Sequence, residues 1–119
     1  AIARVVAQET ALLLAATGSA VYRLECDLLV TCIAAHPPGE DGSVVPWTLE
    51  LGGDTVTALV ARSGLPARVD DYRAPGRRDP SVRRALESGL RSGIAAPLWT
   101  AGRLWGILVA GSDQPGAFG

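Results

Sequence analysis

The strongest constraint on the fold lies in the last quarter of the sequence, where two apolar runs flank a tight turn. Residues 92–99 and 103–112 are joined by residues 100–102, which read TAG. A three-residue turn that ends in glycine predicts an antiparallel β-hairpin. Gly106, inside the second run, suits a bulge or a close backbone approach, and Pro97 should lie at an edge or irregularity because it cannot donate to a ladder.

Shorter elements precede this hairpin. We expect three helices: one over residues 2–16, one from a cap at Asp54 to Gly64, and one from Asp79-Pro80 to Gly89. Strands are expected over residues 19–24, 28–35, 44–51 and 67–69, and a loop at residues 37–42. The first two strands are apolar at nearly every position, which indicates a sheet covered on both faces. The order α-β-β-β-α-β-α-β-β predicts an α+β fold, with a largely antiparallel sheet of five or six strands flanked by helices.

Composition narrows the class of protein. With 119 residues the chain forms one domain, and 48% hydrophobic against 19% charged residues excludes intrinsic disorder. Its apolar runs fall far short of the roughly 20 residues of a membrane span. A net charge of −1 gives no reason to expect contact with nucleic acid or an anionic membrane. The absence of Met and an uncapped start lead us to expect a fragment of a larger protein, and the use of Arg without Lys favours a GC-rich bacterial genome.

Three segments, in their order and spacing, resemble a GAF domain. They read PARVDDY at residues 66–72, GLRSGIAAPL at residues 89–98 and GRLWGILV at residues 102–109. The similarity covers nearly the whole chain and is of the kind found in actinobacterial sensor histidine kinases. It implies a PAS-related fold and a single sensory domain over residues 1–119. It also implies a regulatory role in bacterial two-component signalling. No general base, nucleophile or metal cluster stands out among the residues, so we expect no catalysis by the domain itself.

The same resemblance bears on partners. GAF domains normally finish with a long helix that packs beside the first and continues to the output domain, but this chain ends at Phe118-Gly119, where that helix should begin. We therefore expect the final helix to be missing and a homodimer to form through the terminal helices, including residues 1–16. In the full-length protein the partner domain would be its own kinase. The domain is expected in the cytoplasm.

Four residues are candidates for contact with a small-molecule ligand. Trp47, Asp71 and Tyr72 are placed by the resemblance near the family's cavity between the sheet and the connecting segments, and such pockets combine apolar walls with few polar groups. His36, the only histidine, is either an axial haem ligand or an ordinary surface-loop residue. Trp105 is expected in the core. The residues do not identify a cofactor.

Cys26 and Cys32 leave three readings open. They are two ordinary thiols, a disulfide, or a redox pair, because one GAF enzyme reduces free methionine sulfoxide with cysteines and other members attach bilins to one. Cys32 lies in mid-strand, where packing is the simpler explanation. No zinc set can be assembled from two cysteines and one histidine.

Two further features could bind anions. Gly52 and Gly53 precede a helix whose free amides could hold phosphate or a cyclic nucleotide, although the Asp54 carboxylate is expected to occupy them. A cluster of arginines forms either an anion-binding or partner-facing patch or a solvated face: Arg73, Arg77, Arg78, Arg83, Arg84 and Arg91.

The leading hypothesis is a sensory module that relays ligand binding through its terminal helices. The alternatives are a ligand-free dimerisation and spacing module and, third, a redox enzyme.

Overall fold

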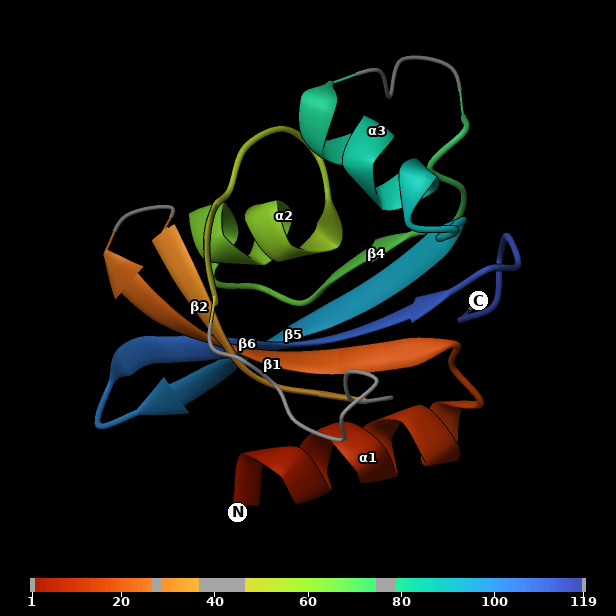
Figure 1. The fold of residues 1–119 in the computed structure, drawn as a ribbon. Helices are drawn as coiled ribbons and strands as arrows, with labels where there is room; N and C mark the ends of the chain where they lie inside the picture. The colour runs from red at the N-terminus through yellow and green to blue at the C-terminus, as the bar shows by residue number, and fades with distance from the viewer. Residues whose placement is uncertain (1, 27–28, 37–46, 75–78, 119) are drawn as a thin grey trace.

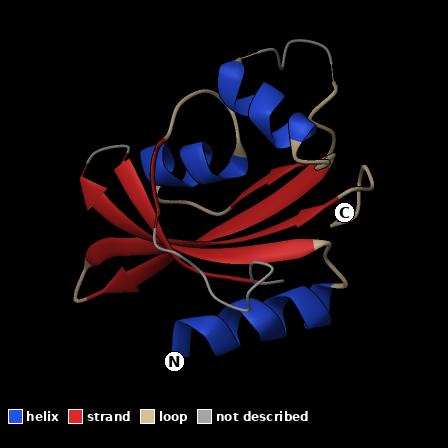
Figure 2. Ribbon diagram, viewed as in Figure 1, coloured by secondary structure: helices blue, strands red, loops and turns tan. Residues whose placement is uncertain are grey.

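A computed structural model describes residues 2–26, 29–36, 47–74 and 79–118. The elements are α1 (Ile2–Leu14), β1 (Gly18–Cys26), β2 (Leu29–His36), β3 (Trp47–Glu50), α2 (Val56–Ser63), β4 (Ala67–Val69), α3 (Pro80–Glu87), β5 (Ser92–Thr100) and β6 (Arg103–Ser112). The strands form one six-stranded antiparallel sheet in the order β3-β2-β1-β6-β5-β4. Helix α1 covers one face of it, and α2 and α3 lie on the other (Figure 1, Figure 2). The predicted α+β class is confirmed.

Each face of the sheet has its own core. On the α2/α3 face the buried residues include Val30, Val60, Val82 and Ile107, all fully inaccessible to solvent. On the α1 face the buried cluster is much smaller and consists of Ala7, Val21 and Ala34. The sheet is thus covered on both sides, as the apolar strands predicted.

The C-terminal hairpin forms with a tighter turn than expected. Thr100 pairs with Arg103, so only Ala101 and Gly102 make the turn, with φ values of 50° and 77°. Positive φ at both residues is the type I′ geometry that matches the twist of the flanking strands. The expected three-residue turn is therefore corrected to two residues.

Gly106 and Pro97 occupy the positions that their backbones require. A Cβ on Gly106 would overlap the carbonyl oxygen of Tyr22, so this glycine permits the close approach of β6 to β1. Pro97 lies beyond Ala95, where the pairing of β5 with β4 stops, and next to a bulge between Leu98 and Trp99. Both expectations are confirmed.

Helix boundaries follow from their caps. Asp79 caps α3 as predicted, since its carboxylate accepts a hydrogen bond from the Val82 amide at 2.9 Å. The predicted cap of α2 was wrong by one residue: Thr55 caps the helix through its hydroxyl, while Asp54 pairs with Arg62. The helix starts one residue later because Thr55, not Asp54, accepts from the amide three residues on.

Other expectations need correction or remain outside the description. Helix α1 ends at Leu14 rather than residue 16, because Ala15 takes φ 51°. Trp105 is 40% exposed, not core, since it is the extra residue of the bulge and lies beyond the last β1–β6 pair. Three predicted features lie outside the described residues: the loop at residues 37–42, the start of the strand expected at residue 44, and Arg77 with Arg78.

None of the described helices combines the length and the apolar character that a membrane crossing needs.

Candidate functional site

A cavity of about 200 Å³ lies between the sheet and the two helices α2 and α3. Its apolar wall comes from the sheet residue Val109, from Val56 of α2 and from Ala85 of α3, and two tyrosines, Tyr22 and Tyr72, complete it. A second hollow of about 190 Å³ is lined by the same two tyrosines, by Val56 and by Val109. The two hollows therefore adjoin, and their lining comes from β1, β3, β5, β6, α2 and α3 and from the segment that carries Tyr72.

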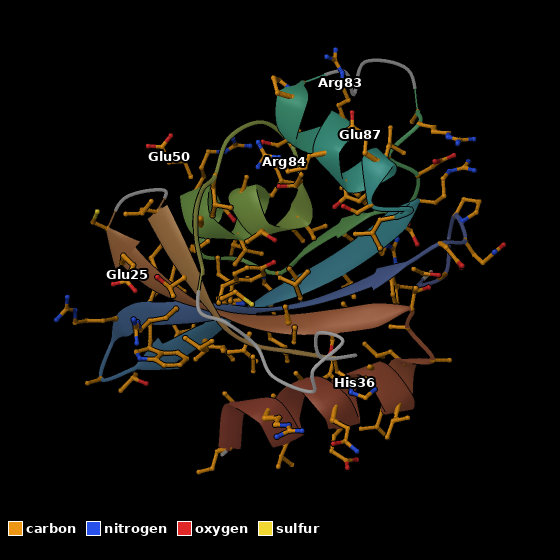
Figure 3. All side chains as sticks on the ribbon, viewed as in Figure 1. Glu25, His36, Glu50, Arg83, Arg84 and Glu87 are labelled. Carbon is orange, nitrogen blue, oxygen red and sulfur yellow. The ribbon has the colours of Figure 1, made fainter. Side chains whose placement is uncertain are left out.

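Polar groups line the cavity chiefly on its helical side. Ser81, Arg84 and Ser88 come from α3 and its C-cap, Thr57 comes from α2, and Glu50 comes from the end of β3. Arg84 and Glu50 are exposed, so a positive and a negative charge lie at the opening (Figure 3). An apolar interior with few polar groups is the usual composition of a site for a small organic molecule.

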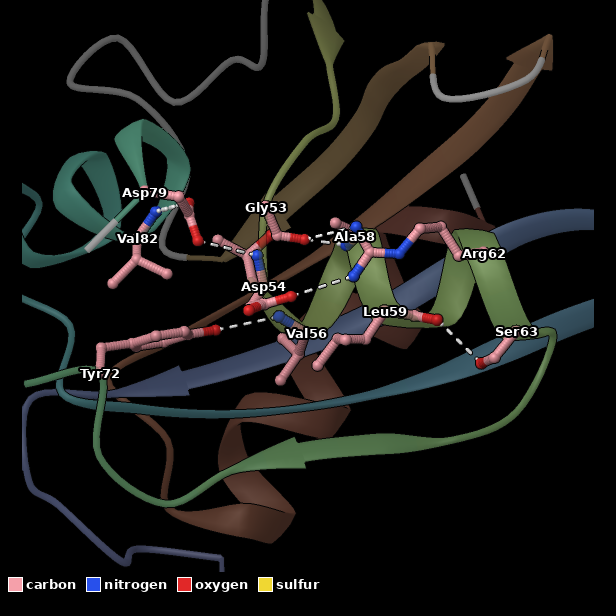
Figure 4. A network of polar contacts seen from close by, with 11 residues as sticks. Gly53, Asp54, Val56, Ala58, Leu59, Arg62, Ser63, Tyr72, Asp79 and Val82 are labelled. Carbon is pink, nitrogen blue, oxygen red and sulfur yellow. Dashed lines mark hydrogen bonds and ion pairs between the residues drawn. The ribbon is translucent and has the colours of Figure 1, made fainter. Parts of the chain in front are cut away.

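One end of the cavity is fixed by a polar network (Figure 4). The hydroxyl of buried Tyr72 accepts a hydrogen bond from the amide of Val56, the first residue of α2, at 3.1 Å. The Asp79 carboxylate accepts from the amides of Val82 at 2.9 Å and Asp54 at 3.1 Å. The start of α3 is thereby joined to the loop before α2, and the spacing of the two helices above the sheet is set.

Burial keeps two titratable side chains, Tyr22 and Cys32, in their neutral forms at neutral pH. The pKa of Tyr22 rises to about 12, mainly because burial disfavours the phenolate and secondarily because Cys32 lies nearby. Burial also raises the pKa of the Cys32 thiol, whose sulfur donates to the Ala34 carbonyl at 3.5 Å. At neutral pH both groups are uncharged, so Tyr22 presents a neutral hydroxyl at the cavity.

Of the four predicted ligand contacts, the structure brings one to the cavity. Tyr72 lines both hollows. Asp71, next to it, is not among the residues that line either hollow, and its carboxylate makes two hydrogen bonds to Arg91 at 3.0 and 3.1 Å. These bonds, with one from the Arg73 amide, lower the pKa of Asp71. Its local role is an ion pair that ties the segment after β4 to the start of β5.

The other two predicted residues belong to β2 and β3. His36 pairs with Ser19, whose hydroxyl donates to the Ala7 carbonyl of α1, so His36 lies on the α1 face of the sheet (Figure 3). Trp47 begins the edge strand β3, where its backbone pairs with Cys32, and its side chain lies outside what the structure describes. His36 and Tyr72 therefore lie on opposite sides of the sheet.

A β-bulge explains the position of His36. Val21 pairs with Ala34 but Tyr22 pairs with Cys32, so Ile33 is an extra residue in β2. Without it, His36 would share the face of Cys32 and Tyr22, because alternate residues of a strand point to one side. The bulge moves His36 to the α1 face.

Sequence reasoning missed most of the cavity. On α3 and its C-cap, Ser81, Ala85 and Ser88 recur at helical spacing, and this small-residue face was the available signal. Arg84, which the sequence placed in the arginine cluster, is exposed and also lines the cavity. Tyr22 carried no signal beyond being a polar-tipped aromatic in an apolar strand.

Side chains already accept hydrogen bonds from backbone amides at the start of α2, where the sequence suggested an anion site. The Asp54 amide is bonded to Asp79, the Val56 amide to Tyr72 and the Ala58 amide to Thr55. These three side chains, rather than the Asp54 carboxylate, occupy the amides around the first turn. The structure therefore gives no support to a phosphate or cyclic nucleotide at this point.

The two cysteines do not form a pair. Cys26 is exposed at the end of β1, whereas Cys32 is buried in β2 opposite Tyr22. Four residues of β1 separate Tyr22 from Cys26, about 13 Å at the usual rise of a strand. A disulfide needs α-carbons within about 7 Å, so the two cannot be bridged without backbone movement. Within the described residues, no group of His, Cys, Asp or Glu is arranged to hold a metal ion.

The fold defines a small α+β domain with helices on both faces of one antiparallel sheet and a cavity on one of them. A family comparison matches the GAF domain over residues 1–119, and the chain belongs to the GAF domain family. No match was found among curated proteins. The resemblance inferred from the three sequence segments is confirmed at the level of the family.

Solved structures show the same fold at low sequence identity. Free methionine-R-sulfoxide reductase from Neisseria meningitidis, in complex with its substrate, superposes with a TM-score of 0.74 at 19% identity, over 98% of this chain and 64% of that one. The GAF domain of Acinetobacter phosphoenolpyruvate-protein phosphotransferase gives 0.71 at 15% identity, over 95% and 65%. The blue-light absorbing form of the PixJ GAF-domain from Thermosynechococcus elongatus gives 0.75 at 15%, over 96% and 69%. The chain thus spans less than two thirds of the first two, and these likenesses concern the fold.

Proposed function

We propose that this chain is a sensory GAF domain of a bacterial signalling protein, a sensor histidine kinase, and that a small molecule binds in the cavity beneath α2 and α3. The observation that carries the proposal is the cavity itself, which has an apolar wall, two tyrosines and charged residues only at its opening. Tyr72 joins the cavity to the first amide of α2, so a ligand beside it would act on the position of that helix.

The proposed relay runs through the terminal helices to a kinase output domain. Helix α1 packs across β1, β2 and β6, and β1 and β6 also line the cavity on their other face. A ligand changes the output only by as much as its affinity differs between the two arrangements of these helices. We further propose that α1 contributes to a homodimer, because Ile2 and Leu13 are each 82% exposed on it.

The proposed role is regulatory and not catalytic. Two of the similar structures are named as free methionine-R-sulfoxide reductases, which makes a redox enzyme the alternative to exclude. The separation of Cys26 from Cys32 along the β1–β2 ladder argues against that chemistry here, as does the absence of both from the described lining of the cavity. The unpaired thiols are in keeping with a reducing compartment, and we place the domain in the cytoplasm.

Native mass spectrometry of the chain purified from bacterial cells tests ligand binding. We expect a retained small-molecule mass on the unmodified domain. Ala85→Trp should abolish it, because an indole at this position of α3 fills a cavity of about 200 Å³. Arg83→Trp is the matched control: it places the same side chain two residues away on the exposed side of the same helix and should retain the mass.

A domain that carries no extra mass in repeated preparations would favour the ligand-free spacing module instead. For the proposed dimer, sedimentation of Leu13→Glu against the parent chain is the direct test. The charge should shift the population to monomer, and an unchanged dimer would place the interface elsewhere.

A further inference from the structure

The sheet divides at one end into two separate hairpins. Strands β1 and β6 pair from Gly18 opposite Gly111 as far as Arg23 opposite Gly106. Continued pairing would join Leu24 to Trp105, but no such pair forms, although both strands go on. The β1–β2 hairpin and the β5–β6 hairpin turn away from each other there (Figure 1). We call the space between residues 24–26 and residues 103–105 the hairpin fork.

Two β-bulges produce the fork. Leu24 pairs with Val30 and Cys26 with Leu29, which leaves Glu25 as an extra residue in β1. On the other side Trp105 is the extra residue in β6. A bulge bends its strand and increases the local twist, so two bulges placed directly after the last shared pair turn the two hairpins apart.

Each side of the fork is a strand edge with which no other described strand pairs. From Leu24 to Cys26, β1 keeps β2 as its neighbour but has lost β6. From Arg103 to Trp105, β6 keeps β5 but has lost β1. Such edges present unpaired amide and carbonyl groups and are templates for another extended segment.

The side chains around the fork select the kind of segment. A groove of about 370 Å³ lies there, and its apolar part is formed by Leu24, Leu104 and the 40% exposed Trp105. Two arginines also line it: Arg23, which pairs with Glu25 at 2.9 Å, and Arg103, which has no ion pair with any described residue. The groove therefore combines apolar surface with a positive charge that forms no ion pair within the described part of the chain.

We propose that the hairpin fork binds an extended segment of a partner protein in which acidic and apolar residues alternate. The segment adds as a strand along the open edge of β1 or β6. Its apolar side chains cover Trp105, Leu24 and Leu104, and its carboxylates meet Arg103 and Arg23. Main-chain hydrogen bonds supply the affinity of such strand addition, and the side chains supply the selectivity. This surface is separate from the cavity beneath α2 and α3.

Fluorescence polarisation with a labelled heptapeptide of alternating Glu and Val tests the proposal on the whole 119-residue chain. We expect saturable binding that weakens as salt rises, and no binding of the matching peptide of Lys and Val. Arg103→Glu should weaken binding about tenfold or more, whereas Arg83→Glu, at another exposed arginine, on α3, should change it less than about twofold. Arg103→Lys should keep most of the affinity.

A backbone-modified peptide separates strand addition from simple charge attraction. Methylation of the three central amide nitrogens of the Glu–Val peptide removes its ladder donors and should abolish binding. Equal binding of the methylated peptide, equal binding to Arg103→Glu, or no binding at millimolar peptide would overturn the proposal. So would a chain that self-associates through Arg103 and excludes the peptide, since a second copy would then be the occupant.

Discussion

The two faces of the sheet use apolar surface in different ways. On the α2/α3 face, side chains such as Val60, Val82 and Ile107 are fully buried, and the same face holds the cavity, one end of which is fixed by hydrogen bonds. On the α1 face, the buried cluster consists of three residues, two of them alanines: Ala7, Val21 and Ala34. Helix α1 leaves large apolar residues exposed: Ile2, Val5, Leu12, Leu13 and Leu14.

The difference separates internal stability from external contact. The α2/α3 face buries its apolar residues within the domain and leaves a cavity for a ligand. On the α1 side, exposed apolar side chains of α1 offer a surface for a partner helix. The sheet is the element that both faces share. Substitutions should therefore lower the free energy of unfolding by different amounts: most in the sheet, less in the buried cores, and least in the hydrogen bonds and ion pairs around the cavity.

The largest effect is expected at the sheet itself. Gly106→Ala forces a Cβ against the Tyr22 carbonyl, a backbone atom that cannot move without shifting β1, and should cost roughly 3 kcal/mol of unfolding free energy. Urea denaturation measures this. Gly102→Ala is the matched control, since its Cβ meets nothing within 4 Å and only its φ of 77° resists alanine, at about 1 kcal/mol. Equal losses would mean that β1 and β6 do not approach as described.

The next largest loss of unfolding free energy is expected on the α2/α3 face, and a substitution on α1 provides the direct comparison. Val60→Ala removes two buried methyl groups from the α2/α3 core and should cost about 2 kcal/mol. Leu13→Ala removes a larger side chain from α1, but because that side chain is 82% exposed the loss should stay below about 0.5 kcal/mol. Thermal denaturation at low protein concentration is the measurement. Similar losses at the two positions would contradict the separation of the faces.

A smaller effect is expected in the network around the cavity. Tyr72→Phe keeps the ring but removes the hydroxyl that accepts from the Val56 amide, and should cost about 1–2 kcal/mol. Amide hydrogen exchange should show the first turn of α2 opening more readily, while α1 is unchanged. Unaltered exchange at Val56 would show that this bond does not hold the helix.

The smallest effect is the pH dependence of the Asp71–Arg91 pair. Because the pKa of Asp71 is lowered from 3.8, chiefly by the hydrogen bonds from Arg91, the stabilisation is present above pH 3.8 and is lost as pH falls through the lower folded value. Asp71→Asn should therefore be less stable than the parent at pH 7, and the gap should narrow below pH 3.8. A gap that stays the same below pH 3.8 would contradict this role of the Asp71 carboxylate.

Local chemistry allowed much of the fold to be predicted. Asp79 before a proline gave the α3 cap, Gly64 gave the end of α2, and a glycine-ended turn gave the final hairpin. These features depend on neighbouring residues, whose conformational preferences are set by their own side chains. They were visible without any knowledge of what lies across the sheet.

The candidate site was harder to predict because it depends on register. The extra residue Ile33 sends His36 to the face opposite Tyr72, and the extra residue Trp105 leaves an expected core side chain exposed. Both bulges lie between consecutive strands, but a bulge depends on how the two strands pair, and nothing in the residues beside it reveals it. Among the predicted contacts whose side chains the structure describes, Tyr72 lines the cavity, as its position at the end of the short strand before α3 suggested, and its contact with a ligand stays a prediction.

The central claim is that the cavity beneath α2 and α3 holds a small molecule, and a crystal structure of the domain purified directly from bacterial cells tests it most plainly. We expect non-protein electron density between Tyr22, Tyr72 and Val109, and none in crystals of Ala85→Trp. A hollow filled only by water or by repacked side chains, in crystals whose protein was never exposed to denaturant, would contradict the account.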